Sequence, residues 1–134
     1  MSIVKRLFIF VLIIASILPV SAQETDPVII FRGKHHSFGK FTQKTPKKRV
    51  VFPFKNVGTS PLVIDHVTTH CSCTTVTYTK SPVKPGETGY VIVTYIGKDE
   101  SGYRYGYFSR QVTVATNGKP QFIRLFIEGE LIEE

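Results

Sequence analysis

The sequence contains no tryptophan, one methionine and only two cysteines among its 134 residues. Two cysteines cannot build the dense disulfide framework that stabilises very small secreted domains, so the fold must depend on a hydrophobic core. Hydrophobic residues make up 42% of the chain and charged residues 20%, which excludes an intrinsically disordered or collagen-like protein. The length allows one domain together with a targeting segment.

One long apolar run is present, and it lies at the N-terminus. Lys5 and Arg6 precede the apolar residues 7–18, and a proline and three small residues follow. This order is typical of a secretory signal peptide. The run is shorter than the ~20 residues that span a bilayer, so a permanent N-terminal anchor is the weaker alternative. The sequence therefore predicts a cleaved signal peptide over residues 1–22, contact with the membrane only through that peptide, and a periplasmic or extracellular location.

From residue 23 to residue 134 apolar and polar residues alternate, with turn residues at regular spacings and no convincing amphipathic helix. Alternation with a period of two predicts half-buried β-strands. Seven or eight such strands predict an all-β domain, an immunoglobulin-like antiparallel β-sandwich. The expected strands cover residues 28–31, 37–41, 49–56, 62–69, 74–79, 89–95, 108–116 and 121–129.

The residues on one face of each alternation form the expected core between the two sheets. A register error of one residue would turn them toward solvent, so their burial tests the strand assignment. The expected core residues are Phe52, Phe54, Leu62, Ile64, Val91, Val93, Val112, Val114, Leu125 and Ile127.

Several short motifs follow one another in a distinctive order. They are Phe38-Gly39-Lys40-Phe41, Phe52-x-Phe54-x-Asn56-x-Gly58, Pro61-Leu62 with Ile64, Cys71-Ser72-Cys73-Thr74, Pro85-Gly86 and Thr116-Asn117. This order resembles the bacterial secreted family called domain of unknown function 1573. The resemblance implies an immunoglobulin-like β-sandwich related in architecture to major sperm protein and chaperone-type modules, and it implies no established activity. That family usually has glycine between the two cysteines, where this chain has Ser72.

The two cysteines, Cys71 and Cys73, are separated by one residue and follow two histidines, His66 and His70. Residues two apart on an extended strand lie ~6.6 Å apart, so a disulfide here requires a tight turn. We favour a structural pair at the crossover between two strands. The alternatives are thiol-redox activity in an oxidising compartment and a copper or zinc site that includes both histidines. The histidines and cysteines lie on opposite faces of an unbroken strand, so a shared metal site also requires a bulge or turn.

A tyrosine-rich segment follows Gly102 and includes a second glycine, Gly106. Tyr103, Tyr105 and Tyr107 alternate with other residues, and Arg104 lies among them. Tyrosine and arginine are enriched at binding hot spots, so the segment predicts a contact surface for a protein or glycan. The alternative is that these tyrosines only continue the next strand and cover the sandwich.

The excess of positive charge is local, because seven cations and no acid lie between residues 32 and 49. Such a run can bind an anionic partner, but a solvated surface is the simpler interpretation, and export argues against nucleic acid as the partner.

No nucleophile elbow, P-loop or zinc-protease motif occurs, and Asp65 and His66 point to opposite faces of a strand. The sequence therefore predicts no catalytic activity and no cofactor.

These observations predict a secreted, non-enzymatic β-sandwich that serves as an interaction or structural module in the bacterial envelope. Partner capture is expected through edge-strand pairing and through the segment 103–107. The alternative function is that of a thiol-redox or copper-binding protein that uses Cys71 and Cys73. The sequence does not determine an oligomeric state.

The first prediction is cleavage between Ala22 and Gln23 during export. The charged start, the short apolar run and the small residues before the cleavage point motivate it. N-terminal sequencing of the exported protein should find Gln23 as the first residue. A membrane-bound chain that still begins at Met1 would contradict the predicted localisation.

Overall fold

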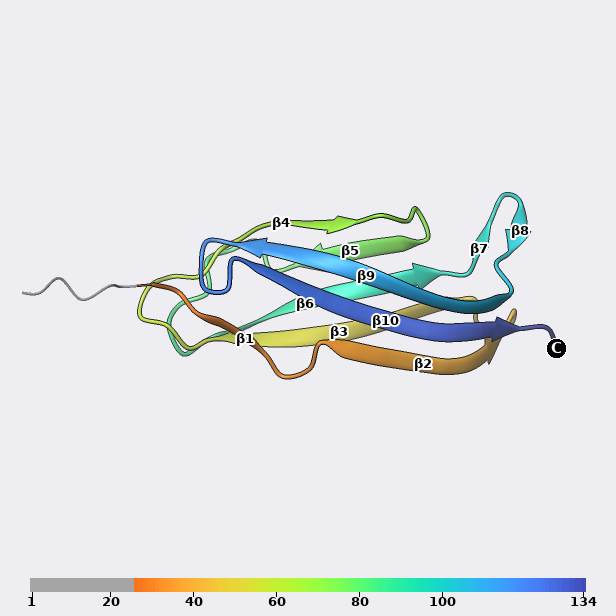
Figure 1. The fold of residues 1–134 in the computed structure, drawn as a ribbon, viewed down its shortest axis with the longest axis horizontal. Helices are drawn as coiled ribbons and strands as arrows, with labels where there is room; N and C mark the ends of the chain where they lie inside the picture. Colours follow the sequence, from red (N-terminus) through yellow and green to blue (C-terminus); the bar gives the residue numbers. More distant parts are fainter. Residues whose placement is uncertain (1–25) are drawn as a thin grey trace, which may run out of the picture.

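The computed structural model describes residues 26–134, which form two four-stranded β-sheets packed face to face (Figure 1). The predicted signal peptide lies outside the described residues. The strands are β1 (Ile29–Phe31), β2 (His35–Thr42), β3 (Lys47–Asn56), β4 (Ile64–Thr69), β5 (Thr74–Tyr78), β6 (Thr88–Ile96), β7 (Lys98–Asp99), β8 (Gly102–Tyr103), β9 (Gly106–Thr116) and β10 (Phe122–Ile132).

The first sheet has the order β1-β3-β6-β5 and the second has the order β2-β10-β9-β4. Neighbouring strands pair antiparallel, except that β2 and β10 pair parallel. The predicted immunoglobulin-like sandwich is therefore confirmed. Within residues 26–134, no helix is long and apolar enough to cross a membrane.

The predicted number of strands, seven or eight, is too low, because residues 26–134 form ten. The two sheets account for eight strands, and β7 and β8 form a separate two-stranded hairpin. Each of these two strands is two residues long and exposed or half-buried. Alternation of apolar and polar residues does not extend over such short strands, so periodicity could not identify them.

All ten predicted core residues are buried between the sheets. In β3, Phe54 is 2% exposed, and its ring packs against that of Phe31 with the ring centroids 5.4 Å apart. Farther along the sandwich, the rings of Tyr95 and Phe108 stack with centroids 3.6 Å apart and planes inclined by 8°. Because Tyr95 belongs to the first sheet and Phe108 to the second, this pair joins the two layers near the end of β6.

One buried polar residue, Asn56, joins several loops where β3 ends, at the left-hand end of the sandwich in Figure 1. Its Nδ2 donates to the carbonyl oxygens of Ser60 (2.8 Å) and Val83 (2.9 Å). Its Oδ1 accepts from the backbone N–H groups of Gly58 (2.9 Å) and Val28 (3.3 Å). The amide therefore uses both donors and both acceptor positions, which satisfies a polar group that is 0% exposed.

Gly58 is required at its position because the N-terminal segment passes directly over its Cα atom. A Cβ atom there would lie closer than 3.0 Å to backbone atoms of residues 26–28. This close approach explains the spacing Asn56-x-Gly58, because Asn56 supplies the amide that bonds to Val28 and Gly58 leaves room for the segment that contains Val28.

The second prediction concerns the packing of β3. Replacing Phe54 with alanine should lower the free energy of unfolding by ~3–5 kcal/mol, because it removes a buried aromatic ring and leaves a cavity. Val51 on the same strand is 49% exposed, so Val51→Ala is the matched control and should change stability by only ~0.5 kcal/mol. Denaturant unfolding measures both variants, and equal losses would mean that the register of β3 is wrong.

Candidate functional site

Cys71 and Cys73 lie in the turn that carries the chain from β4 in one sheet to β5 in the other, and they form a disulfide with each other. The Thr74 N–H donates to the Cys71 carbonyl oxygen at 3.2 Å, which closes the tight turn that a disulfide at this spacing needs. No non-glycine residue in 26–134 has positive φ, so Ser72 fits between the cysteines without a left-handed backbone.

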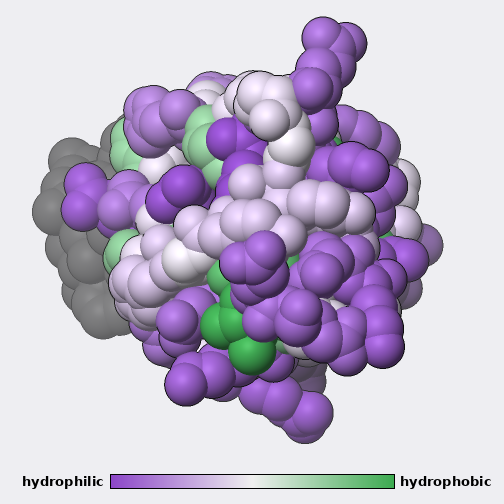
Figure 2. Space-filling model, turned by 90° about the vertical axis from the view of Figure 1, so that its right-hand side faces the viewer, coloured by the Kyte–Doolittle hydropathy of each residue, from purple (hydrophilic) through white to green (hydrophobic). Residues whose placement is uncertain are grey.

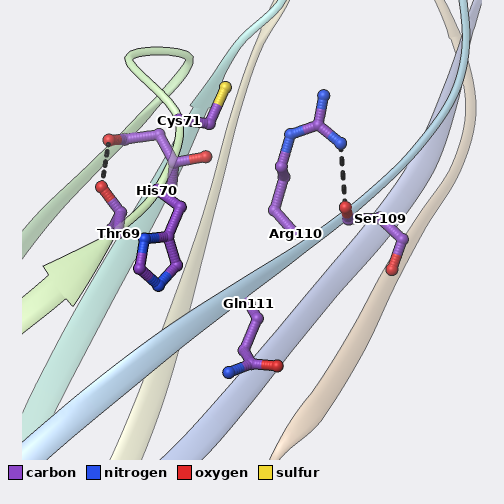
Figure 3. Close-up of a pocket in the computed structure, with 7 residues that line it drawn as sticks. Thr69, His70, Cys71, Ser109, Arg110 and Gln111 are labelled. Carbon is purple, nitrogen blue, oxygen red and sulfur yellow. Dashed lines mark hydrogen bonds between the residues drawn. The ribbon is translucent and has the colours of Figure 1, made fainter.

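The two sulfur atoms have different surroundings. Cys73 is 1% exposed and belongs to the hydrophobic core, whereas Cys71 is half-buried and lines a pocket of about 380 Å³. Figure 3 shows His70 and Cys71 on the turn side of this pocket, with Arg110 and neighbouring residues of β9 on the other side. A molecule that enters the pocket therefore meets Cys71.

Each sulfur atom accepts a hydrogen bond from a nitrogen donor. The Cys73 N–H donates to Cys71 Sγ at 3.2 Å, and Arg110 Nε donates to Cys73 Sγ at 3.3 Å. Arg110 Nη1 donates to the carbonyl oxygen of Ser109 at 2.8 Å, and no carboxylate of residues 26–134 pairs with this guanidinium. A cation that no carboxylate of the described residues neutralises thus lies against the disulfide.

Sequence reasoning missed Arg110, although the strand pattern contains a signal for it. Phe108, Val112 and Val114 are core-facing residues of β9, and residue 110 has the same parity. An arginine at a core-facing position needs a polar partner, because a buried charge without one is costly. The partner itself lies 37 positions away in the sequence, so local patterns could not identify it.

The structure does not gather the four residues of the alternative copper or zinc site into one group of possible metal ligands. His66 and His70 are exposed, and the two cysteines are bonded to each other. Residues 26–134 contain no group of three or more His, Cys, Asp or Glu side chains that could hold a metal ion.

The tyrosine-rich segment forms β8, the start of β9 and the residues between them. Tyr103, Tyr105 and Tyr107 are exposed, and the rings of the first two lie with centroids 5.7 Å apart. The Tyr107 hydroxyl donates to Glu128 Oε2 at 2.7 Å, and this bond raises the pKa of Tyr107. The segment therefore presents aromatic rings with polar tips to solvent.

Arg104 is held inside the hairpin by Asp99. Arg104 Nη2 donates to Asp99 Oδ2 at 2.6 Å, while the Ser101 hydroxyl and N–H donate to Asp99 Oδ1 at 2.5 and 2.8 Å. The bonds from Ser101, followed by the charge of Arg104, hold the pKa of the Asp99 carboxyl below its usual value. The guanidinium thus fixes the shape of the hairpin, and the tyrosines provide its accessible surface.

The disulfide turn and the tyrosine hairpin lie at the same end of the sandwich, on the right in Figure 1. The Ile96 N–H donates to the Cys73 carbonyl oxygen at 2.7 Å, and the hairpin begins two residues later at Lys98. Figure 2 views the molecule from this end, where pale residues of intermediate hydropathy cross a largely hydrophilic surface beside a small hydrophobic patch.

The basic run between residues 32 and 49 does not form a single patch, because it spans β2 in one sheet and β3 in the other. Lys44 Nζ pairs with Glu134 Oε1 at 2.9 Å, and Lys48 Nζ lies 5.1 Å from the centre of the Phe41 ring. This distribution agrees with a solvated surface.

Strand β5, which begins directly after Cys73, is an open edge of the first sheet. Cys73 accepts from Ile96 and the Thr79 N–H donates to Tyr90, so the odd-numbered residues bond to β6. The backbone groups of the even-numbered residues Val76 and Tyr78 consequently point away from the sheet. Among residues 26–134, no strand pairs with this side of β5.

The other edges have features that disfavour strand addition. Strand β1 has only three residues, and β4 is interrupted by an irregularity between Ile64 and His66. The pairing of β2 is irregular between Glu128 and Glu130 of β10. Strand β5 has neither a register shift, nor a proline, nor a charged residue. It is therefore the edge with the least protection against pairing with another chain.

Comparison with known proteins identifies a matching family and several solved structures of similar fold. A family described as "Protein of unknown function (DUF1573)" has a sequence model that matches residues 29–131. A protein of unknown function from Porphyromonas gingivalis W83 has a similar structure, with a TM-score of 0.70, 16% identity, and coverage of 84% of this chain and 51% of the other. The present chain thus spans about half the length of that protein.

Two further solved structures are similar. The ASH/PapD-like domain 7 of human CEP192 has a TM-score of 0.63 at 12% identity, over 88% of this chain and 94% of that one. The YadV chaperone has a TM-score of 0.54 at 13% identity, over 77% of this chain and 51% of that one. At these identities the similarities show the fold. No match was found among curated protein sequences.

Proposed function

The chain belongs to the DUF1573 family, as its motifs indicated, and we propose that it is an exported, non-enzymatic interaction module of the bacterial envelope. It captures an extended segment of a protein partner by strand addition at β5, and the tyrosines of the hairpin contact the same partner. The single observation that carries this proposal is the open edge of β5, whose own residues carry no charge, next to the end that bears the tyrosines.

Strand addition at β5 would satisfy backbone groups that otherwise bond only to water. The N–H and carbonyl groups of Val76 and Tyr78 lie on the open side, and each main-chain hydrogen bond contributes about 0.5–1.5 kcal/mol. Thr75 and Thr77 expose their side chains on the outer face of the sheet, where alternate side chains of an added strand would also lie. The edge therefore offers general backbone affinity, while specificity must come from neighbouring side chains.

The tyrosines supply such side chains. Their rings are large, carry a hydroxyl that can bond to a partner, and have few rotatable bonds, so their ordering on binding costs little entropy. Ser101 and Arg104 both donate hydrogen bonds to Asp99, so the closed hairpin presents the rings together, although these exposed bonds can open while the sandwich stays folded. The similar structure of the YadV chaperone agrees with a protein-binding role for this architecture, although the β5 edge is what supports it here.

The third prediction tests the tyrosine contact with a matched pair of positions. Tyr105 on the hairpin is 48% exposed and Tyr90 on the outer face of the first sheet is 46% exposed. A photo-cross-linking phenylalanine analogue at position 105 should form a covalent adduct with an envelope partner in living cells, whereas the same analogue at position 90 should not. Adducts from position 90 alone would assign the contact to the sheet face and contradict the proposal.

The fourth prediction tests the β5 edge in the same cells. Val76→Pro removes an N–H that faces away from β6, so it should abolish the adduct from position 105 while the pairing with β6 is kept. A variant with Thr75→Lys and Thr77→Lys provides a second test, because lysines at a sheet edge discourage pairing. Thermal unfolding verifies that each purified variant is folded. Undiminished adducts in both folded variants would exclude β5 as the capturing edge.

A further inference from the structure

We propose that the Cys71–Cys73 disulfide is a thiol-exchange site that oxidises a dithiol on an exported protein. This inference is independent of strand capture at β5, because it depends on the pocket beside the disulfide turn. It follows from three observations: Cys71 is half-buried and lines a pocket whereas Cys73 is buried, the buried sulfur has a cationic donor, and that cation has no counter-ion among the described residues.

Accessibility determines which sulfur is attacked. Thiol–disulfide exchange begins when a thiolate attacks one sulfur atom and expels the other. Cys73 is 1% exposed, so an external thiolate cannot reach its Sγ atom. Cys71 lines the pocket, and the pocket volume of about 380 Å³ can admit a cysteine side chain with its neighbours. Attack therefore takes place at Cys71, and Cys73 is the leaving group.

Arg110 stabilises the leaving group. Its Nε donates to Cys73 Sγ at 3.3 Å, and the Thr74 hydroxyl lies 3.6 Å from the same sulfur. Cations and hydrogen-bond donors beside a cysteine favour its thiolate form. In the oxidised protein the guanidinium has no carboxylate partner among residues 26–134, so reduction provides the anion that this half-buried cation lacks. The charge of Arg110 thus favours the reduced site over the oxidised one.

The exchange balances without any further reactant. The partner thiolate bonds to Cys71 Sγ, the bond between Cys71 and Cys73 breaks, and Cys73 leaves as a thiolate beside Arg110. A second thiolate of the partner then attacks the partner's own sulfur in this mixed disulfide and expels Cys71. The partner dithiol loses two electrons and two protons and becomes a disulfide, while Cys71 and Cys73 gain the electrons as a dithiol or its thiolates.

The equilibrium between the protein and glutathione tests the role of Arg110. The protein is incubated in buffers of defined ratio of reduced to oxidised glutathione, quenched with acid, alkylated and measured by intact mass. Arg110→Met should shift the midpoint toward more reducing buffers, with an equilibrium constant for reduction that falls about tenfold, which corresponds to one pKa unit on a stabilised thiolate. Arg124→Met is the matched control, because Arg124 is exposed on β10, and it should leave the midpoint unchanged. Equal midpoints for both variants would overturn the proposal.

Trapping of the mixed disulfide tests the order of attack. With oxidised glutathione, Cys73→Ser should form an adduct at Cys71 in the folded protein, and Cys71→Ser should form none at the buried Cys73. If either variant is unfolded by thermal analysis, the reduced wild-type protein is treated with iodoacetamide instead, and peptide masses should show that Cys71 is modified at least about tenfold faster. Faster reaction at Cys73, or a disulfide that resists excess dithiothreitol in the folded protein, would show that the pair is structural.

Discussion

The buried side-chain amide of Asn56 is the constraint on which one end of the sandwich depends. Four hydrogen bonds from a single group tie the incoming N-terminal segment, the loop after β3 and the loop before β6 to one point. Any loop that moved away would leave part of the amide buried and unsatisfied, which is costly. These loops are therefore fixed together at that end of the sandwich.

Different interactions organise the opposite end of the sandwich, which carries the groups proposed to act on a partner. There the sheets are joined by the stacked rings of Tyr95 and Phe108 and by the disulfide turn, while the hairpin depends on exposed bonds to Asp99. Bonds at the surface are weaker and open more easily than buried ones. The pocket lined by Cys71 and the exposed tyrosines thus lie at this end, and the open edge of β5 begins beside them.

The core and most strands could be predicted because successive side chains of a strand point to opposite faces. Apolar and polar residues therefore alternate wherever one face is buried. Phe54 and Val112 are buried as their parity requires, and the tight turn that Cys71 and Cys73 needed is present. The parallel pairing of β2 with β10 was not predictable, since it joins segments far apart in the sequence. The bonds of Arg104 to Asp99 and of Arg110 to Cys73 depend on the folded geometry in the same way.

Asn56 fixes one end of the sandwich, whereas the hairpin at the other end can open locally. Native-state hydrogen exchange tests this difference most directly. The amide of Gly58, which bonds to Asn56 Oδ1, should exchange only with the free energy of global unfolding. The amide of Ser101, which bonds to Asp99, should exchange through local opening at a much lower free energy, with no sensitivity to denaturant. Exchange of both amides with the same free energy and the same denaturant dependence would contradict the account.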